Sequence, residues 1–429
     1  MLRIKRLHIS DIWIGICMFI VVFSPPIINT NLLHAVAAFS WVYILFHFDA
    51  VRYFIPHGFS IKLVIILSFF AVYIASSALV HFNPLVDVTV DFIYWIFEII
   101  PFCIFVTTWY QKQRRSLDDL MNLMIVVGIV QAVLAILAFV IPSLQEFFIQ
   151  RLIDYGYEVS LRELSAYRMY GFALSLTSYS AFYLAVMACA ALYYYIATGR
   201  ISYIIKMGLL IFAAVINART GAIIFLAGAV VIFFYRREKK KDHFAWKLLF
   251  LVLLALCVPF AVSLISKGNE ETLQWLTSGY EDIEQLFRGS KGGTTSTFYY
   301  YSRFWKFPTN ILTFLFGNGC QMMGSTARIK YQFTTDVGFV NDLWKWGVFG
   351  ALALYFAFFW LILFKCRSNA ANSPVEKYLR GMLLVSFLVI NLKGYFFVNQ
   401  GTVTLVLIYA FYHQSLEKCR ERRIAELTA

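Results

Sequence analysis

Long runs of apolar residues, separated by short polar or basic segments, recur along the whole chain. Each run is about 20 residues long, the length that a helix needs to cross a bilayer. We therefore predict an all-α, polytopic transmembrane protein with about 12 spans. The predicted spans lie near 11–29, 31–48, 61–81, 88–109, 119–141, 172–197, 201–217, 220–235, 246–265, 337–364, 376–398 and 400–416.

The predicted spans divide the chain into three parts. Residues 1–265 hold the first nine transmembrane helices, with an external loop at 142–171. Residues 266–336 form a large external loop between spans 9 and 10. This loop is expected to be partly helical, because apolar residues follow helical spacing between Leu273 and Phe287. Residues 337–429 hold the last three helices and a cytoplasmic tail.

Composition and charge placement support this interpretation. The 429 residues are 60% hydrophobic and 14% charged, which is too apolar for a soluble domain. The net charge of +13 comes largely from basic clusters such as "RIKR", "KQRR", "RREKKK" and "KCRERR". All of these fall on one side of the predicted spans, so the positive-inside rule places both termini in the cytoplasm. The positive-inside rule thus explains the basic net charge without a nucleic-acid partner.

Cysteine and histidine give no sign of a metal or disulfide framework. The seven cysteines are scattered singly, and none of the seven histidines lies between Pro259 and Leu392. We therefore expect no metal and no cofactor. The N-terminal segment is interpreted as a cytoplasmic start followed by a retained first helix, not as a cleaved signal peptide.

One charge interrupts the long apolar stretch between Lys206 and Arg236. Arg219 lies in "NART", between two short predicted spans. The stretch is expected to form a hairpin with Arg219 at its outer turn, or a re-entrant segment. The arginine then either reaches lipid phosphate at the surface or binds a ligand. The small and polar neighbours Asn217, Thr220 and Gly221 favour close approach of a ligand.

Arginines and aromatic residues also gather on the predicted external side. An arginine fork binds phosphate through two parallel hydrogen bonds and stays charged at physiological pH. Aromatic faces stack on sugars. This combination indicates a lipid-linked, phosphorylated glycan as the ligand. The candidate binding residues are Arg168, Asn217, Arg219, Tyr301, Arg303 and Trp305.

Four stretches, in order, resemble the Wzy-type O-antigen and capsule repeat-unit polymerases and the related O-antigen ligases. "YRMYGF" (167–172) is similar to an Arg-x-x-Gly segment before a span, and "NARTGAIIFL" (217–226) to a Ser-Arg-Thr-Gly turn with alanine in place of serine. "YSRFWKFPTNILTFLFGNG" (301–319) resembles a segment that runs from an arginine through a tryptophan to Phe-Gly-x-Gly. "TTDVGFVNDLWKWGVFG" (334–350) resembles a closing pattern that ends in Trp-Gly-x-x-Gly.

The resemblance implies a glycosyltransferase at the periplasmic face of the bacterial inner membrane. Its donor and acceptor would be undecaprenyl-pyrophosphate-linked repeat units of an O-antigen or capsule, and a chain-length regulator is a possible protein partner. An acceptor hydroxyl would attack the anomeric carbon of the donor, and undecaprenyl pyrophosphate would leave. We expect Arg219 and Arg303, with Arg168, to stabilise the leaving pyrophosphate, and Asp336 to act as the base.

Several alternatives remain open. The ligases typically carry a histidine in the last stretch, where this chain has Asp336, so polymerase is favoured over ligase. A flippase for lipid-linked oligosaccharides would show repeated halves and no long external segment. Glycosyltransferases that use polyprenyl-phosphate sugars commonly carry two acids in the first external loop, which here is "SPPIINTN".

Acidic and basic residues near or within the predicted spans also allow more than one interpretation. Asp336 is placed in the first turn of a helix, where a carboxylate is favoured by the helix dipole, so it could be a cap as well as a base. Glu158 and Glu163 are alternative bases. Within the spans, Asp342 and Lys345 are spaced to pair with each other, and Glu98 and Lys393 are candidates to pair across helices.

Overall fold

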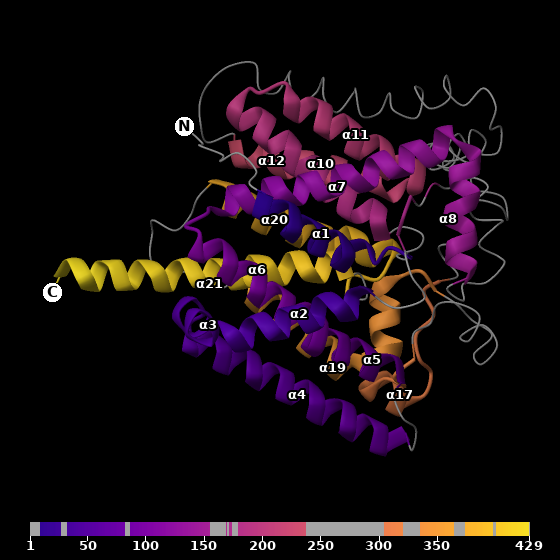
Figure 1. Cartoon of the computed structure of the whole chain (residues 1–429). Helices are drawn as coiled ribbons and strands as arrows, with labels where there is room; N and C mark the ends of the chain where they lie inside the picture. Colours follow the sequence, from indigo (N-terminus) through magenta and orange to yellow (C-terminus); the bar gives the residue numbers. More distant parts are fainter. Residues whose placement is uncertain are drawn as a thin grey trace. The chain divides into compact units, whose positions relative to one another are not determined.

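The computed structural model describes residues 9–26, 32–81, 86–154, 169, 171–173, 179–236, 304–320, 335–363, 374–397 and 400–428. Within these ranges every regular element is a helix, so the predicted all-α class is confirmed (Figure 1). The predicted span 246–265 and the predicted amphipathic segment within 266–336 lie outside the described residues.

Five helices of the described part are long and apolar enough to cross a membrane, and a sixth is added if one bent pair counts as a single span. The bent pair consists of α2 (Leu32–Phe46) and α3 (Phe48–Phe54), with 87° between them. The five are α4 (His57–His81), the continuous helix Asp87–Lys112, α7 (Leu117–Val140), α10 (Tyr179–Thr198) and α19 (Gly338–Leu363).

The remaining helices are shorter, amphipathic or more polar. Three of them are apolar but shorter: α1 (Ile9–Phe23), α11 (Ser202–Asn217) and α12 (Thr220–Arg236). Two overlap the predicted spans 376–398 and 400–416: α20 (Pro374–Lys393) and α21 (Gln400–Thr428). The other two lie in predicted external segments: α8 (Pro142–Asp154) and α17 (Ile311–Phe316).

The helix Asp87–Lys112 is not regular. It consists of α5 (Val86–Tyr94), a π-helical turn η1 (Trp95–Ile99) and α6 (Ile100–Lys112). A π-helical turn contains one residue more than an α-helical turn, and such turns are frequent at functional sites. The carbonyl of Phe97 in this turn accepts a hydrogen bond from Trp41 Nε1 of α2 at 3.0 Å.

The helices form two compact units. Unit 1 contains α1, α7, α8, α10, α11 and α12. Its α10 packs against both α11 and α12 (Figure 1). Five buried alanines make this close packing possible, because small side chains let helix backbones approach one another. They are Ala181, Ala185, Ala188, Ala190 and Ala191.

Unit 2 contains α2 to α6 with η1, α17, α19 and α21. Its α4 lies at the edge of this unit (Figure 1), and only five of its 25 residues are buried. The side chains on its outer face are apolar and exposed, among them Val64, Ile65 and Val72. An exposed apolar face of this length is expected where a helix contacts lipid.

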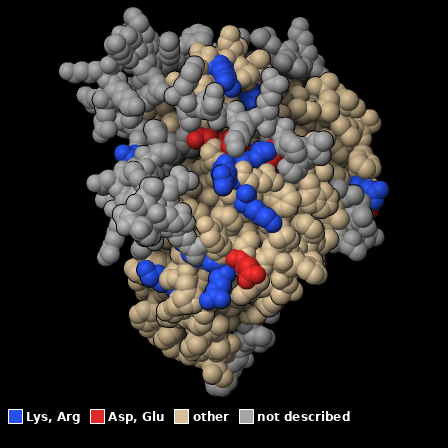
Figure 2. Space-filling view, turned by 60° about the vertical axis from the view of Figure 1, so that its left-hand side comes forward, with Lys and Arg blue, Asp and Glu red and all other residues tan. Residues whose placement is uncertain are grey.

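Charged side chains are sparse on the described surface. On the face shown in Figure 2, Lys and Arg predominate over Asp and Glu, and both lie among uncharged side chains. This distribution agrees with the composition of the chain, in which 37 Lys and Arg residues accompany 24 Asp and Glu residues.

Candidate functional site

The predicted hairpin around Arg219 is present in unit 1. α11 ends at Asn217, Ala218 and Arg219 form the turn, and α12 begins at Thr220. The two helices approach closely beside Gly221, where an added Cβ would lie 3.0 Å from Cβ of Ala214. Arg219 is half-buried between two buried neighbours. The turn therefore holds the arginine at the end of a tightly packed pair of helices.

Asn217 has a structural contact in this turn. Its side chain is buried, and Nδ2 donates a hydrogen bond to Oγ of Ser180 in α10 at 2.7 Å. Its amide oxygen is also buried and has no hydrogen-bond partner within the described ranges. The predicted ligand-binding residue thus fixes the Arg219 turn to α10.

The first family-like stretch lies against this hairpin. The backbone N–H of Met169, in "YRMYGF", donates a hydrogen bond to the carbonyl of Ile216 at 3.2 Å. Two residues later Gly171 has φ of +62°, and an added Cβ would lie 2.7 Å from Nε2 of Gln131. A residue with a Cβ would be strained at this position. The first two stretches are therefore neighbours, although Arg168 itself lies outside the described residues.

The third and fourth stretches are neighbours in unit 2. Oγ1 of Thr335 donates a hydrogen bond to the carbonyl of Phe304, and Nε1 of Trp344 donates one to the carbonyl of Lys306, both at 2.8 Å. The N–H groups of Asn318 and Gly319 donate to carbonyls of Trp344 and Lys345. We call this contact between 304–319 and 335–350 the motif junction.

Two glycines meet at the centre of the motif junction. Gly317 has φ of 70° and ψ of 167°, and Gly347 has φ of 64° and ψ of 179°. This region of backbone conformation is accessible essentially to glycine alone. A Cβ at Gly317 would lie 2.4 Å from the carbonyl oxygen of Lys345, and a Cβ at Gly347 would lie 2.3 Å from the nitrogen of Gly317. Gly347 is also where α19 departs from helical geometry.

Tyr73 of α4 holds the break in α19. Its hydroxyl lies within hydrogen-bond distance of the carbonyls of Phe316 and Trp346, and it accepts a hydrogen bond from the N–H of Gly350. Ser77, one turn further along α4, donates to the same Phe316 carbonyl at 2.8 Å. The backbone groups released by the break in α19 are therefore bonded to α4.

Tyr73→Phe is expected to destabilise the protein by about 1–3 kcal/mol, because buried backbone groups lose their partner. The change should appear as a lower midpoint of thermal unfolding of the detergent-solubilised protein. Tyr195→Phe, at a half-buried tyrosine of α10, is the matched control and should leave the midpoint unchanged. Equal midpoints for the two variants would contradict the role of the Tyr73 hydroxyl.

The start of α19 differs from the prediction for Asp336. The helix begins at Gly338, so Asp336 precedes it by two residues and does not lie in its first turn. Two other side chains are hydrogen-bonded at this start. Oγ1 of Thr335 accepts from the N–H of Val337 at 3.1 Å, and Nδ2 of Asn341 donates to the carbonyl of Thr335 at 2.8 Å. Asp336 is exposed beside the motif junction.

The residues before Asp336 in the chain are only partly described. Trp305 is exposed, with 38% of its surface accessible, next to the Thr335 contact with Phe304. Arg303 and Tyr301 lie outside the described residues, although Arg303 immediately precedes Phe304 in the chain. Glu158 and Glu163, the alternative bases, lie outside them as well. The described part therefore brings Trp305 and Asp336 to one junction.

Buried charged residues lie on the same helix as the motif junction. Lys345 forms an ion pair with Asp91 of α5, and its side chain is fully buried. Asp342 instead accepts a hydrogen bond from the hydroxyl of Tyr355 at 2.6 Å. Asp342 and Lys345, which the sequence spacing suggested as partners, thus have different partners. Nζ of Lys345 also lies 5.4 Å from the ring centre of Tyr395.

Glu98 has a partner that sequence reasoning missed. Its carboxylate lies 2.7 Å from Nδ1 of His34 in α2, and the ring of His34 stacks on Tyr94. The side chain of Lys393, the suggested partner, lies outside the described residues. Among the described residues no three His, Cys, Asp or Glu side chains are grouped to hold a metal ion.

Comparison of the chain with protein-family models, with curated proteins and with solved structures finds no match.

Proposed function

We propose that the protein is a glycosyltransferase that polymerises undecaprenyl-pyrophosphate-linked oligosaccharide repeat units at the periplasmic face of the bacterial inner membrane. The observation that carries the proposal is the pairing of the family-like stretches. The first contacts the second through Met169 and Ile216, and the third contacts the fourth at the motif junction. Within each unit two of the four stretches are thus in contact, and this supports the proposal that each pair belongs to a functional region.

The proposal includes the topology of the chain. It places 12 spans in the membrane, both termini in the cytoplasm, and the Arg219 turn and the motif junction on the periplasmic side. The five or six long apolar helices support a membrane location, and the basic clusters support the orientation.

In the proposed reaction an acceptor hydroxyl forms a bond to the anomeric carbon of the donor. The bond from that carbon to the pyrophosphate oxygen breaks, and undecaprenyl pyrophosphate leaves. Asp336 would accept the hydroxyl proton; its exposure next to the motif junction supports this role. Arg219, Arg303 and Arg168 would stabilise the negative charge that develops on the leaving pyrophosphate.

Arg219→Lys tests the proposal, because a lysine keeps the charge but loses the two-pronged hydrogen bond. A contact that strengthens in the transition state contributes roughly 3 kcal/mol, so on the order of a hundredfold in rate should be lost. The measurement is the surface glycan of a deletion strain that expresses the variant at wild-type membrane levels. Single repeat units on the surface are expected in place of long chains.

The matched control is Arg200→Lys, the same substitution at an exposed arginine just before α11. It should leave the chain-length distribution unchanged. Normal polymer from Arg219→Lys would show that Arg219 only anchors the hairpin to lipid phosphate. Long lipid-linked polymer that fails to reach the core in the deletion strain would indicate a ligase instead.

A further inference from the structure

Apolar side chains are exposed on a stretch that lies outside the predicted spans. The stretch 304–320 contains α17 and belongs to the predicted external loop 266–336. No residue of α17 is buried, and Lys306 is the only charged residue of the stretch. The large apolar side chains exposed on it are those of Trp305, Phe307, Ile311 and Leu312. A cluster of exposed apolar side chains indicates contact with lipid or with protein.

Hydrogen bonds fix the level at which α17 meets α4. The carbonyl of Phe316 accepts from the hydroxyls of Tyr73 and Ser77, at 3.2 and 2.8 Å. Tyr73 lies about 12 Å before the end of α4 at His81. The whole helix is about 37 Å long, which is only about 7 Å more than the hydrocarbon core of a bilayer. When α4 crosses a bilayer, its contact with Phe316 through Tyr73 therefore lies within the hydrocarbon region.

The stretch begins and returns at the same end of α19. The carbonyl of Phe304 accepts a hydrogen bond from Thr335, which lies just before the start of α19 at Gly338. Gly317 instead lies against Gly347, about 13 Å further along α19. The chain therefore runs beside α19 for about this distance and is back at the start of the helix at Thr335. This is the path of a re-entrant segment.

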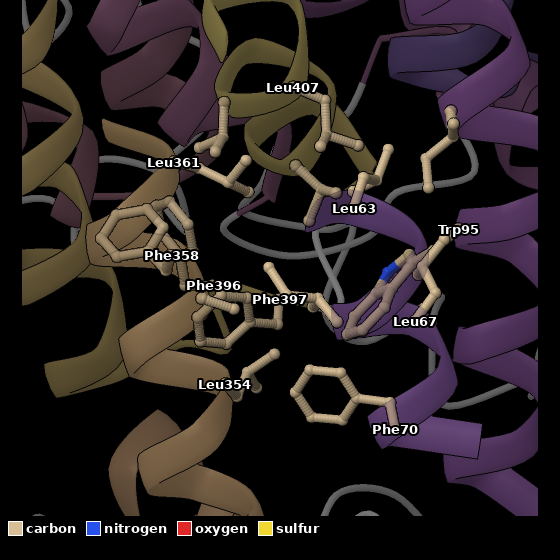
Figure 3. A pocket seen from close by; sticks show the side chains of 15 residues that line it. Leu63, Leu67, Phe70, Trp95, Leu354, Phe358, Leu361, Phe396, Phe397 and Leu407 are labelled. Carbon is tan, nitrogen blue, oxygen red and sulfur yellow. The ribbon is translucent and has the colours of Figure 1, made fainter. Parts of the chain in front are cut away.

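The two helices beside α17 each have an inner and an outer face. Figure 3 shows Leu63 and Phe70 of α4 and Leu354 of α19 pointing into a common apolar space, so these side chains mark the inner faces. The outer faces are apolar as well. Their exposed side chains include Phe69 and Val72 on α4, and Phe349, Leu352 and Phe356 on α19.

These outer faces meet at α17. The ring of Phe349 contacts that of Phe316, with ring centres 5.7 Å apart. The ring of Phe69 stacks on that of Tyr73, whose hydroxyl is bonded to the Phe316 carbonyl. The apolar surface of α17 is therefore continuous with the outer faces of two helices that are long and apolar enough to cross a membrane.

The backbone at both ends of α17 is hydrogen-bonded. Oδ1 of Asn310 accepts from the N–H groups of Leu312 and Thr313, at 2.8 and 3.5 Å. At the other end the N–H of Gly317 donates to the carbonyl of Thr313 at 2.8 Å. Backbone groups without partners are costly in hydrocarbon, and non-helical backbone is found at membrane depth only where protein or water satisfies it. These bonds, with those from α4, reduce the cost of placing α17 in a bilayer.

We propose that residues 304–320 form a re-entrant segment that contacts the acyl chains of one leaflet through Ile311 and Leu312. In the proposed topology this is the outer leaflet. The bilayer is the occupant because the exposed surface continues that of two candidate spans. Lys306 is compatible with this place, since a lysine stem lies along apolar surface while its ammonium reaches lipid phosphate. The inference goes beyond the polymerase activity and does not depend on it.

Fluorescence quenching in lipid nanodiscs tests the inference. Ile311→Cys is labelled with the fluorophore NBD in protein whose native cysteines are replaced by alanine. Val72→Cys on the outer face of α4 is the lipid control, and Ser116→Cys, exposed between α6 and α7, is the water control. Phosphatidylcholine with a doxyl group on its acyl chain should quench Ile311→Cys as it quenches Val72→Cys, and about threefold more than Ser116→Cys. Iodide should quench Ile311→Cys about threefold less than Ser116→Cys, because hydrocarbon excludes it.

Quenching by iodide as strong as at Ser116→Cys would place α17 in water and overturn the inference. Weak quenching by both agents would show that another protein segment or a second copy of the chain covers α17, which would overturn it as well. Leu312→Cys, at the neighbouring exposed side chain, replaces Ile311→Cys if the labelled protein does not fold.

The wild type provides an independent test. A phospholipid with a photoactivatable acyl chain should label peptides from residues 304–320 as well as peptides from α4. Labelling of α4 without labelling of 304–320 would overturn the inference. None of these readouts involves polymerisation, so the re-entrant segment can fail while Arg219→Lys still stops polymerisation, and the polymerase proposal can fail while the segment still contacts lipid.

Discussion

Gly347→Ala is expected to destabilise the protein by on the order of 4 kcal/mol, because two independent costs coincide. The backbone at Gly347 has a conformation that alanine rarely adopts, with φ of 64° and ψ of 179°. In addition, the new Cβ would lie 2.3 Å from the nitrogen of Gly317 and 2.4 Å from the carbonyl oxygen of Leu315. These are backbone atoms of α17 and the turn after it, so no side-chain rotation relieves the overlap. The expected readout is a large loss of folded protein after detergent extraction.

Gly208→Ala is the control for this experiment. Gly208 lies in α11, and an added Cβ would meet nothing within 4 Å. Alanine at such a helical position is neutral or stabilises by up to about 1 kcal/mol. Equal extraction yield and equal thermal midpoint for Gly347→Ala and Gly208→Ala would contradict the close contact between Gly347 and Gly317.

The second large effect is expected at the buried ion pair. Lys345→Met leaves the Asp91 carboxylate without its cation in the interior of unit 2. Breaking a buried pair by removing one partner typically costs about 3–5 kcal/mol. We expect Lys345→Met to lower the thermal midpoint strongly.

The double variant Lys345→Met/Asp91→Leu should recover most of this loss, since replacing both charges of a buried pair by apolar side chains is often neutral or stabilising. Comparing Lys345→Met and Asp91→Leu with the double variant isolates the interaction energy between the two side chains. A double variant as unstable as Lys345→Met alone would show that Lys345 acts through something other than Asp91.

The described helices could largely be predicted because long apolar stretches and polar breaks determine where they begin and end. α11 begins one residue after the start of the predicted span 201–217, and α12 ends one residue after the end of the predicted span 220–235. The other two ends coincide with the prediction. The polar residues of "NART" explain this success, since they end one apolar stretch and begin the next.

The partners of the charged residues could not be predicted in the same way. Lys345 pairs with Asp91, which is 254 residues away in the chain, whereas sequence spacing points only to its helical neighbour Asp342. Helical spacing identifies contacts within one helix and is silent about contacts between helices. The predicted span 337–364 begins one residue before α19, and at this start the N–H of Val337 donates a hydrogen bond to Oγ1 of Thr335.

The π-helical turn Trp95–Ile99 has a consequence for how the chain tolerates changes in length. Before the turn the helix presents the Asp91 carboxylate to Lys345, and within the turn it presents the Trp95 ring to Trp346, with ring centres 6.2 Å apart. Deleting one residue of the turn would restore regular helix and rotate everything before it by about 100° relative to α6. Asp91 would then turn away from Lys345 while α6 kept its own packing. A single-residue deletion here would thus change the register of α5 relative to α6, with an effect at Asp91 about one to two turns from the deleted residue.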